Sequence, residues 1–346
     1  MSSRAMRAHG RYDLAAARRD LHGHYWTFGS FVRGMVTPLR APRDQPFLAR
    51  LEDPISGTID VTGRLATPPG ARDVVVVLHG LGGSVASRYM LLAAGAALDA
   101  GMACLRLHLR GADRLGGDVY HAGLTHDLEA ALASEELAGF ERIFVLGYSL
   151  GGHVALRWAS DRTRAHSSRV RAIAAICPPI DLASGVRAIQ RIDRRPYQFH
   201  VLRGLKEHYV AVAARHGERT KIAPASIADV RRIRTILEWD ERVIAPRYGF
   251  SSADHYYEEA GVGPHLGAIE IPTLLVAADA DPMIPDATVR PALARASSAV
   301  HVVWTGRGGH VGFPDDLVLG LVDGASALGQ PAAGIEREIV AWLSAR

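Results

Sequence analysis

Cysteine is scarce in this chain of 346 residues, which has only two. Cys104 lies in the stretch Met-Ala-Cys-Leu and Cys177 in Ala-Ile-Cys-Pro, and such apolar surroundings are typical of buried free thiols. Their spacing is not that of metal ligands, so we expect no metal. A chain of this length can bury a sizeable core without disulfides, and free thiols suit a reducing compartment.

Long hydrophobic runs are also missing. No window approaches the roughly 18 uninterrupted apolar residues that a membrane-spanning helix needs. The arginine-rich residues 1–20 are not followed by the apolar region and small-residue cleavage site of a secretory signal. The net charge is only +4, and the arginines are scattered as on a solvated surface. We therefore expect a cytoplasmic protein with no nucleic-acid partner and at most peripheral contact with a membrane.

Complete nucleotide-binding motifs are absent, although a glycine-rich loop follows the apolar, β-branched run at 73–78. This loop, His79–Ser84, reads His-Gly-Leu-Gly-Gly-Ser. Backbone N–H groups at the end of a buried strand can hold an anion, either in an oxyanion hole or in a phosphate cradle. The P-loop lysine and the third glycine of the dinucleotide fingerprint are both missing, so we favour the oxyanion hole and expect no cofactor.

A second glycine-rich motif follows the apolar run at 142–146. Residues 147–151 read Gly-Tyr-Ser-Leu-Gly, and helix-compatible residues continue to position 159. This order predicts that Ser149 lies on a sharp turn between a strand and a helix, where a Cβ at Gly147 or Gly151 would crowd the neighbouring backbone. The pentapeptide alone is common and could be an ordinary turn, but the flanking strand and helix favour a catalytic serine.

Apolar runs and helical periodicities alternate along the chain, which predicts a mostly parallel central sheet with helices on both faces. Strands are expected at 55–65, 73–78, 102–109, 142–148, 170–176, 272–278 and 299–304, and helices at 89–100, 124–138, 154–159 and 335–343. Prolines at 38, 42 and 46 favour an extended segment rather than a long helix for residues 1–50. Residues 316–330 are rich in glycine and alanine, and we expect them to be a loosely ordered insertion.

Residues 181–263 have helical periodicities and no strong strand pattern. A structureless loop of this length is improbable, which favours a helical insertion between two strands. Open α/β sheets bind ligands at the carboxyl ends of their strands, so we expect the insertion to cover that edge as a cap; the alternative is that it packs elsewhere. The predicted division is an N-terminal extended or helical segment packed on the core (1–52), an α/β core (53–180 and 264–346) and a helical cap (181–263).

A serine hydroxyl is a poor nucleophile near neutral pH and needs a base within hydrogen-bond reach and a third group that orients the base. His310 follows the last strand in the loop Gly-Gly-His-Val-Gly-Phe, whose small residues would let an imidazole approach Ser149. The acid is Asp279 or Asp281, which both follow the strand at 272–278. We favour Asp281 because the prolines after it impose a rigid turn; Asp279 could instead cap the strand.

A tetrahedral intermediate needs two preorganised N–H donors. Leu150, directly after the serine, would supply one amide, and Leu81 in the first glycine-rich loop would supply the other. We expect five further residues to support the site without touching the reacting atoms: His79, Gly80, Tyr120, His121 and Asp279. For Tyr120 and His121 we favour a purely structural hydrogen-bonding role over this support of the site.

The order of these motifs resembles the YheT-like branch of the α/β-hydrolase superfamily, which contains esterases and eukaryotic relatives acting on acyl esters and phospholipids. The matching segments are 79–84, 110–111, 120–123, 127–128, 147–152 and 309–313, together with 232–235, 239–240, 245–246, 249–250 and 256–257 in the insertion. The chain departs from the pattern at Ala112-Asp113, where relatives commonly have Cys-Ser or Gly-Ser, and in its N-terminal aromatic segment. The resemblance implies the α/β-hydrolase fold with a helical cap insertion.

We therefore expect a serine hydrolase that cleaves small-molecule carboxylic esters through an acyl-enzyme intermediate. Ser149 would attack, His310 would transfer the proton and Asp281 would orient His310. Aromatic and aliphatic residues of the insertion favour short- to medium-chain apolar acyl groups, although they could simply be the insertion's own core. Acyl transfer to an alcohol or thiol needs the same residues and stays open. A non-catalytic ligand-binding homologue is disfavoured because all three residues are present, and the oligomeric state is left open.

Overall fold

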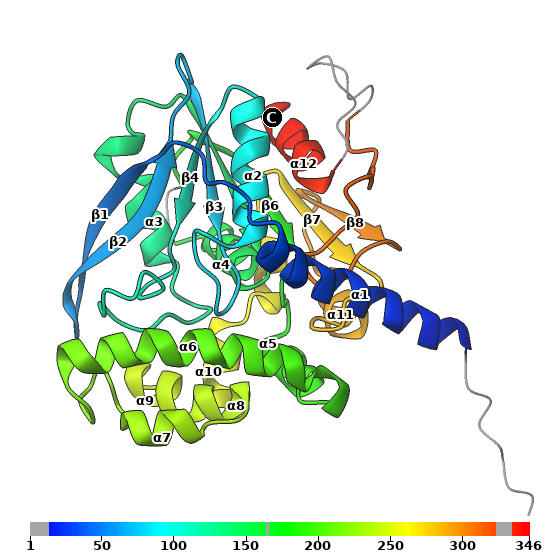
Figure 1. Cartoon of the computed structure of the whole chain (residues 1–346). Coiled ribbons are helices and arrows are strands. Elements are labelled where there is room, and N and C mark those ends of the chain that lie inside the picture. Colours follow the sequence, from blue (N-terminus) through cyan, green and yellow to red (C-terminus); the bar gives the residue numbers. More distant parts are fainter. Residues whose placement is uncertain (1–13, 164–165, 323–333) are drawn as a thin grey trace, which may run out of the picture.

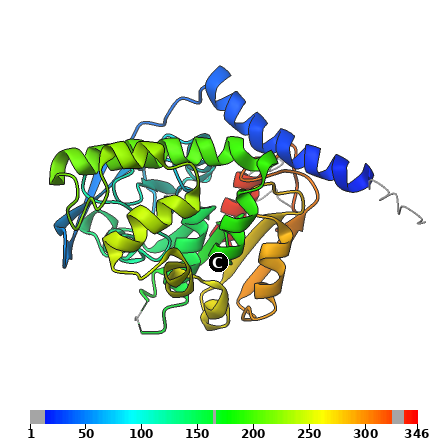
Figure 2. The same cartoon turned by 90° about the horizontal axis from the view of Figure 1, so that it is seen from below.

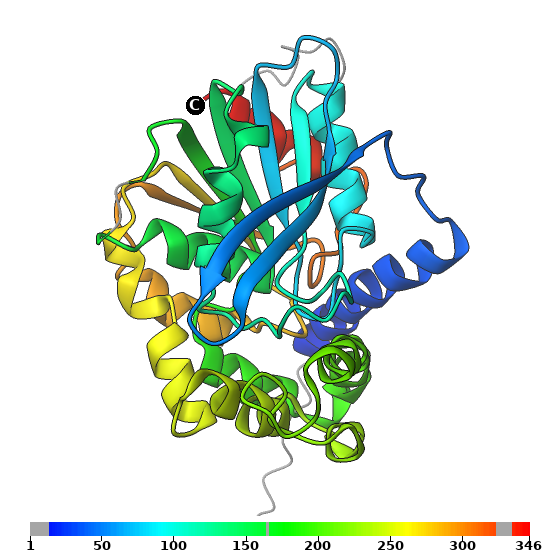
Figure 3. The same ribbon diagram turned by 90° about the vertical axis from the view of Figure 1, so that its left-hand side faces the viewer.

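The computed structural model describes residues 14–163, 166–322 and 334–346 (Figure 1). They form an eight-stranded sheet of order β1-β2-β4-β3-β5-β6-β7-β8. β1 (Gln45–Asp53) and β2 (Gly57–Ala66) pair antiparallel at one edge, and β2 pairs antiparallel with β4 (Ala103–Leu107). All later pairs are parallel. Figure 3 shows the β1-β2 hairpin crossing in front of the other strands. The predicted mostly parallel sheet is confirmed.

The parallel strands are buried on both faces, apart from the edge strand β8, whose residues are mostly partly exposed. They are β3 (Asp73–Leu78), β4, β5 (Arg142–Tyr148), β6 (Val170–Ile176), β7 (Thr273–Ala278) and β8 (Val300–Thr305). Alternate side chains enter two separate cores: Val74 and Val76 of β3 belong to one, and Val75 and Val77 to the other. This alternation follows from the two-residue period of a strand, and it explains why these segments read as continuous apolar runs.

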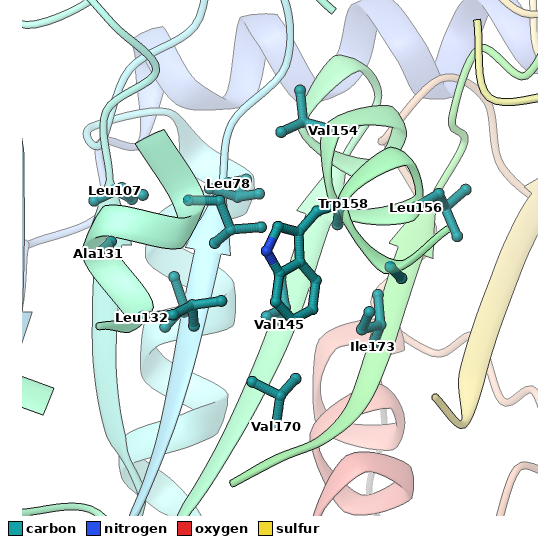
Figure 4. Packing of buried hydrophobic residues seen from close by; sticks show 14 of the residues in the cluster. Leu78, Leu107, Ala131, Leu132, Val145, Val154, Leu156, Trp158, Val170 and Ile173 are labelled. Carbon is teal, nitrogen blue, oxygen red and sulfur yellow. The ribbon is translucent and has the colours of Figure 1, made fainter. Parts of the chain in front are cut away.

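Helices cover both faces of the sheet. α2 (Arg88–Asp99) and α12 (Ile335–Ser344) pack on one face, and α3 (His126–Leu132), α4 (Leu150–Ala159) and α11 (Asp286–Leu293) contribute to the core of the other. Figure 4 shows Trp158 of α4 packed among Val145, Leu132 and Ile173. The helices predicted at 89–100, 154–159 and 335–343 are confirmed, and the one predicted at 124–138 is shorter and ends in a 3₁₀ turn, η1 (Glu135–Leu137).

Between β6 and β7 the chain is helical, as the sequence predicts. The elements are α5 (Leu182–Ile189), η2 (Ile192–Arg194), α6 (Arg195–His216), α7 (Ile227–Arg232), α8 (Ile236–Trp239), the π-helical turn η3 (Asp240–Ile244), α9 (Ala245–Tyr248), α10 (Ala253–Ala260) and η4 (Gly263–Ala268). In Figure 1 they form a layer below the sheet, and in Figure 2, which is seen from below, this layer lies in front of the sheet. Their apolar side chains share a third core with Leu109, Tyr120 and Leu150, which follow the carboxyl ends of strands. The domain boundaries drawn from the sequence stay a prediction.

A buried ionic cluster also joins the insertion to the sheet. Arg247 of α9 forms an ion pair with Asp118, while Arg110, in the loop after β4, pairs with Asp127 of α3 and with Asp53 of β1. Both guanidinium groups are almost fully buried. Loss of one partner would leave an uncompensated buried charge, which typically costs about 3–5 kcal/mol. The cluster therefore fixes three distant segments to one another.

The N-terminal prediction of an extended segment in place of a long helix is wrong for α1 (Leu14–Val36). The three prolines lie after this helix, so none of them removes a hydrogen bond from it. Residues 37–44 contain no helix or strand, and β1 follows them. The sequence reading missed β1, whose Pro46 is tolerated because β1 is an edge strand. Residues 1–13 and the part of the predicted loose insertion at 323–330 lie outside the described residues, whereas 316–322 contain no helix or strand.

In the described residues no helix combines the length and the apolar character needed to cross a membrane.

Candidate active site

Ser149 stands between the last residue of β5 and the first residue of α4, in a conformation that side chains rarely adopt (φ 50°, ψ −118°). The glycines on either side make this turn possible. A Cβ at Gly147 would lie 2.4 Å from the carbonyl oxygen of Gly151, and a Cβ at Gly151 would lie 2.5 Å from that of Leu78. The backbone N–H of Ser149 donates to Ile176 O of β6 at 2.8 Å, which anchors the turn to the sheet.

Ser149, His310 and Asp281 form one hydrogen-bonded chain. The distance from Ser149 Oγ to His310 Nε2 is 2.9 Å, and that from His310 Nδ1 to Asp281 Oδ2 is 2.8 Å. The other carboxylate oxygen of Asp281 accepts the N–H groups of Met283 and Ile284, at 2.8 Å each. When Nδ1–H donates to Asp281, the Nε2 lone pair is free to accept the serine proton. The arrangement can therefore activate a serine hydroxyl as a nucleophile.

Asp279 is not part of the hydrogen-bonded chain formed by Ser149, His310 and Asp281. Its carboxylate pairs with Arg290 of α11 at 2.9 Å, and its N–H donates to Thr305 O of β8. Both side chains of this pair are partly exposed. Of the two candidate acids, Asp281 is thus the one beside His310. Asp279 makes a contact at the end of its strand, which is the other role that the sequence analysis considered for it.

The loop His79–Ser84 passes beside Ser149, since a Cβ built on Gly80 would lie 3.1 Å from Ser149 Cβ. Two tyrosine hydroxyls accept hydrogen bonds from this loop: Tyr89 from Gly80 N–H at 3.0 Å, and Tyr120 from Gly82 N–H at 2.7 Å. Tyr120 is thus hydrogen-bonded to the loop, and it also lines the adjoining cavity.

The two amides expected to hold an oxyanion are those of Leu81, in this loop, and Leu150, the first residue of α4. Among the residues that the structure describes, neither N–H donates a hydrogen bond. Both residues line the cavity that contains Ser149. A helix N-terminus and an unpaired loop amide beside a nucleophile are the donors that a tetrahedral oxyanion requires.

His79 holds the start of the loop through both ring nitrogens. Nδ1–H donates to Gly80 O at 2.8 Å, and Nε2 accepts the N–H of Leu109 at 3.1 Å. This pairing fits only the neutral ring, and burial lowers the pKa of His79 to about 3. His79 is thus a structural support that stays uncharged near neutral pH.

His121 is buried against three aromatic rings of the insertion, those of Tyr248, Phe250 and Tyr256. Its Nδ1 accepts the N–H of Gly123 at 3.1 Å, and burial lowers its pKa to about 3. The side chain also lines the cavity. The sequence reading gave His121 a supporting role or a structural one, and the structure adds a position on the cavity wall.

The cavity at Ser149 has a volume of about 410 Å³ and lies between the strand-end loops and the insertion. Its wall is mostly apolar; the insertion contributes Leu182, Val186, Ile189, Val201, Ile236 and Trp239, and the core contributes Leu150, Met283 and Ile284. A cavity of this size and character suits a small ligand with an apolar portion.

The sequence reading missed that α1 supports the loops of Asp281 and His310. Thr27 Oγ1 accepts the backbone N–H of His310 at 2.8 Å and donates to Gly23 O at 2.8 Å. Gly23 packs so closely on the preceding loop that a Cβ there would lie 1.6 Å from the carbonyl oxygen of Ala280. The small residues Gly23 and Thr27, spaced four apart on one helix face, were the available signal.

One group of possible metal ligands was also missed. Within the described residues, only Cys177, Asp281 and His310 bring three such donor atoms within 4.8 Å of one another. Burial raises the pKa of the Cys177 thiol well above its ordinary value, with the charge of Asp281 acting in the same direction. A metal needs the thiolate, and His310 and Asp281 already bond to each other, so this donor set fits proton transfer better than metal binding.

The unusual pair Ala112-Asp113 has a structural role. Asp113 accepts the hydroxyl of Thr62 in β2 at 2.7 Å and the N–H of Leu115 at 2.9 Å, and Ala112 is buried. These contacts fasten the loop after β4 to the neighbouring strand.

Comparisons with known proteins agree with this fold. Residues 73–317 match the family described as alpha/beta hydrolase fold. The Escherichia coli (strain K12) protein named "Putative esterase YheT" is 29% identical over 311 residues, 86% of this chain and 85% of that protein. "Monoacylglycerol lipase ABHD2" of Danio rerio is 22% identical over 306 residues, 85% of this chain and 69% of that protein.

Among solved structures, Est1E from Butyrivibrio proteoclasticus aligns with a TM-score of 0.49 at 17% identity, over 87% of this chain and 99% of that one. The family match covers more than half of the chain, and the similarity to YheT extends over most of it. The chain is a YheT-like member of the α/β-hydrolase fold family.

Proposed function

We propose that the chain is a serine hydrolase that cleaves small carboxylic esters through an acyl-enzyme intermediate. The observation that carries the proposal is the chain of hydrogen bonds from Ser149 Oγ through His310 to Asp281, beside a largely apolar cavity. Relatives named as an esterase and as a monoacylglycerol lipase support ester chemistry.

In the proposed reaction Ser149 Oγ attacks the ester carbonyl carbon while His310 Nε2 takes the hydroxyl proton. The amides of Leu81 and Leu150 stabilise the oxyanion, and the imidazolium then gives its proton to the leaving alcohol as the acyl-enzyme forms. A water molecule, deprotonated by the same His310, releases the acid. Asp281 keeps Nδ1 protonated throughout.

The apolar cavity wall supports an acyl group of short to medium length, since about 410 Å³ accommodates only a small ester. Hydrolysis of p-nitrophenyl esters of increasing chain length should therefore pass through an optimum and decline for long chains. Product analysis with added alcohol would reveal any acyl transfer.

The decisive experiment is labelling with a fluorophosphonate probe. The wild-type protein should be labelled at Ser149, and Ser149→Ala should be neither labelled nor active while unfolding at the wild-type temperature. Equal labelling of the two proteins would refute the proposal. The reducing compartment inferred from the two free, buried cysteines stays a prediction.

A further inference from the structure

Part of the cavity wall is polar although its surroundings are apolar. Asp240, Tyr256, Tyr257 and His121 all line the same cavity as Ser149. Asp240 belongs to η3 and the tyrosines to α10, whereas His121 comes from the core loop before α3. The polar groups therefore converge from three segments that are distant in the sequence.

The side chain of Asp240 is buried, since the residue is only 7% exposed, and few polar groups replace the water that its carboxyl group has lost. Tyr257 Oη donates to its Oδ2 at 2.6 Å. In the described part of the chain the carboxyl group makes no other hydrogen bond and no ion pair, so Oδ1 remains an open acceptor on the cavity wall. An under-bonded buried carboxyl group is costly, and an apolar residue would stabilise the fold better if packing were its only role.

Two hydrogen-bond donors accompany this acceptor. Since Nδ1 of His121 accepts the N–H of Gly123, the neutral ring carries its proton on Nε2. Tyr256 Oη accepts the N–H of Ala122 at 3.0 Å, which leaves its own proton to donate. Neither donor has an acceptor among the described residues.

The four side chains form a continuous patch. The ring centroids of His121 and Tyr256 are 5.4 Å apart, those of Tyr256 and Tyr257 are 5.1 Å apart, and Tyr257 bonds to Asp240. Asp240 is also the first residue of the π-helical turn η3, and such turns within α-helical segments occur frequently at functional sites.

We propose that Asp240, Tyr256, Tyr257 and His121 form a subsite that binds a free hydroxyl group of the substrate. This inference rests on the proposed ester hydrolysis and specifies its substrate class as neutral esters that carry a hydroxyl group. The hydroxyl donates to Asp240 Oδ1 and accepts from His121 Nε2–H or Tyr256 O–H. A phosphate or carboxylate would lie against the carboxyl group of Asp240, and an ammonium group offers no acceptor to the two donors.

Burial raises the pKa of Asp240 to about 7, so the group is about half protonated at pH 7 and mostly uncharged below it. The ionised form accepts a hydrogen bond from the substrate hydroxyl and the protonated form can donate one to it, so either form suits a neutral hydroxyl. The hydroxyl can belong to the alcohol part or to the acyl chain of the ester. Two matched pairs of substrates separate these sources: glycerol 1-octanoate against propyl octanoate, and ethyl 8-hydroxyoctanoate against ethyl octanoate.

The experiment measures kcat/KM for both pairs by release of the free acid. In one pair the wild-type protein should favour the hydroxylated ester by about tenfold or more, as expected for a buried hydrogen-bonding site that the analogue leaves unpaired. Asp240→Leu should reduce this preference to within about twofold. Tyr257→Phe should reduce it partly, and the exposed Arg242 of the same turn provides the control Arg242→Gln, which should keep it.

Equal kcat/KM within both pairs for the wild-type protein would overturn the subsite, as would a full preference in folded Asp240→Leu. If Asp240→Leu does not fold, Tyr257→Phe replaces it, and an undiminished preference of this variant for the hydroxylated ester would also overturn the subsite. A wild-type protein that hydrolyses the unsubstituted esters and is labelled at Ser149, yet shows no preference, would refute only the subsite. Absence of both labelling and hydrolysis would refute the proposed function and the subsite with it.

Discussion

The carboxylate of Asp281 accepts three hydrogen bonds, from His310 Nδ1–H and from the N–H groups of Met283 and Ile284. Asparagine has a single acceptor oxygen, so Asp281→Asn must turn its amide NH₂ toward either the imidazole or the backbone amides. If it faces the imidazole, His310 is held in the wrong tautomer. We expect kcat for an ester to fall by about 10³- to 10⁴-fold with little change in KM, as measured by steady-state kinetics.

Asp279→Asn is the matched control for this change. Asp279 forms a partly exposed ion pair with Arg290, and such pairs contribute only about 0–1 kcal/mol. Its kcat should stay within about twofold of wild type. The reverse order of the two variants would identify Asp279 as the acid and contradict the assignment of Asp281.

At the level of elements, α1 acts on the site through the backbone of His310. Thr27→Val removes the acceptor of the buried His310 N–H, and an unpaired buried donor costs about 1–3 kcal/mol. We expect kcat to fall about 5- to 100-fold while KM changes less, because the displaced loop carries the imidazole whereas the apolar wall contributed by the insertion is unchanged. Steady-state kinetics with a p-nitrophenyl ester would measure this split.

Thr27→Ser keeps the hydroxyl but loses the methyl group, and we expect it to retain most of the wild-type activity. If the effect of Thr27→Val came from altered packing alone, Thr27→Ser would also lose activity. The exposed Thr37 lies just beyond the end of α1, and its hydroxyl donates to Arg33 O, so Thr37→Val provides the control. Thr27→Val with unchanged kcat would show that α1 does not position His310.

The sequence predicts those elements whose signal is local. The runs at 73–78, 170–176 and 272–278 are rich in aliphatic side chains that a doubly covered strand must bury, and the structure has strands there. α1 was mispredicted because its contact with the core depends on Gly23 against Ala280, a pairing across most of the chain. β1 was missed because its alternation is carried by Phe47 and Ala49 alone and its partner is an adjacent hairpin strand.

The same distinction holds for the site. Ser149, Asp281 and His310 each follow a recognisable strand, so their order along the chain predicted their meeting. Asp240 and His121 reach the cavity only because the insertion folds over the core, and no local pattern marks a carboxyl group that faces a cavity. The tertiary packing of the insertion therefore determines which polar side chains line the cavity, and this packing could not be predicted from the sequence.

At the scale of the whole molecule, burial of titratable groups makes stability depend on pH. Five buried or largely buried histidines have lowered pKa values because of desolvation: His79, His108, His121, His153 and His208. They stay neutral in the folded state while the unfolded chain binds protons below pH about 6.5. Each therefore removes stability as the pH falls from about 6.5 toward 4, by up to about 1.4 kcal/mol per pH unit.

Two carboxyl groups act in the opposite direction. Burial raises the pKa values of Asp240 and Glu336 to about 7, so these groups bind protons in the folded state between pH about 4 and 7 while the unfolded chain does not. Each adds stability as the pH falls through that range. The histidines outnumber the carboxyl groups, so we expect a net loss of stability on acidification from pH 6.5 to 4.5.

Single substitutions separate these opposing contributions. His108→Gln removes a group that the folded state keeps neutral, since burial lowers the pKa of His108 to about 4. The slope of unfolding free energy against pH, from urea titrations between pH 4.5 and 6.5, should become shallower by about 1 kcal/mol per pH unit. Asp240→Asn should make the slope steeper by a similar amount, because it removes the proton that the folded state gains beside Tyr257. Parallel slopes for the wild type and both variants would mean that neither group is held in the protonation state that its burial imposes.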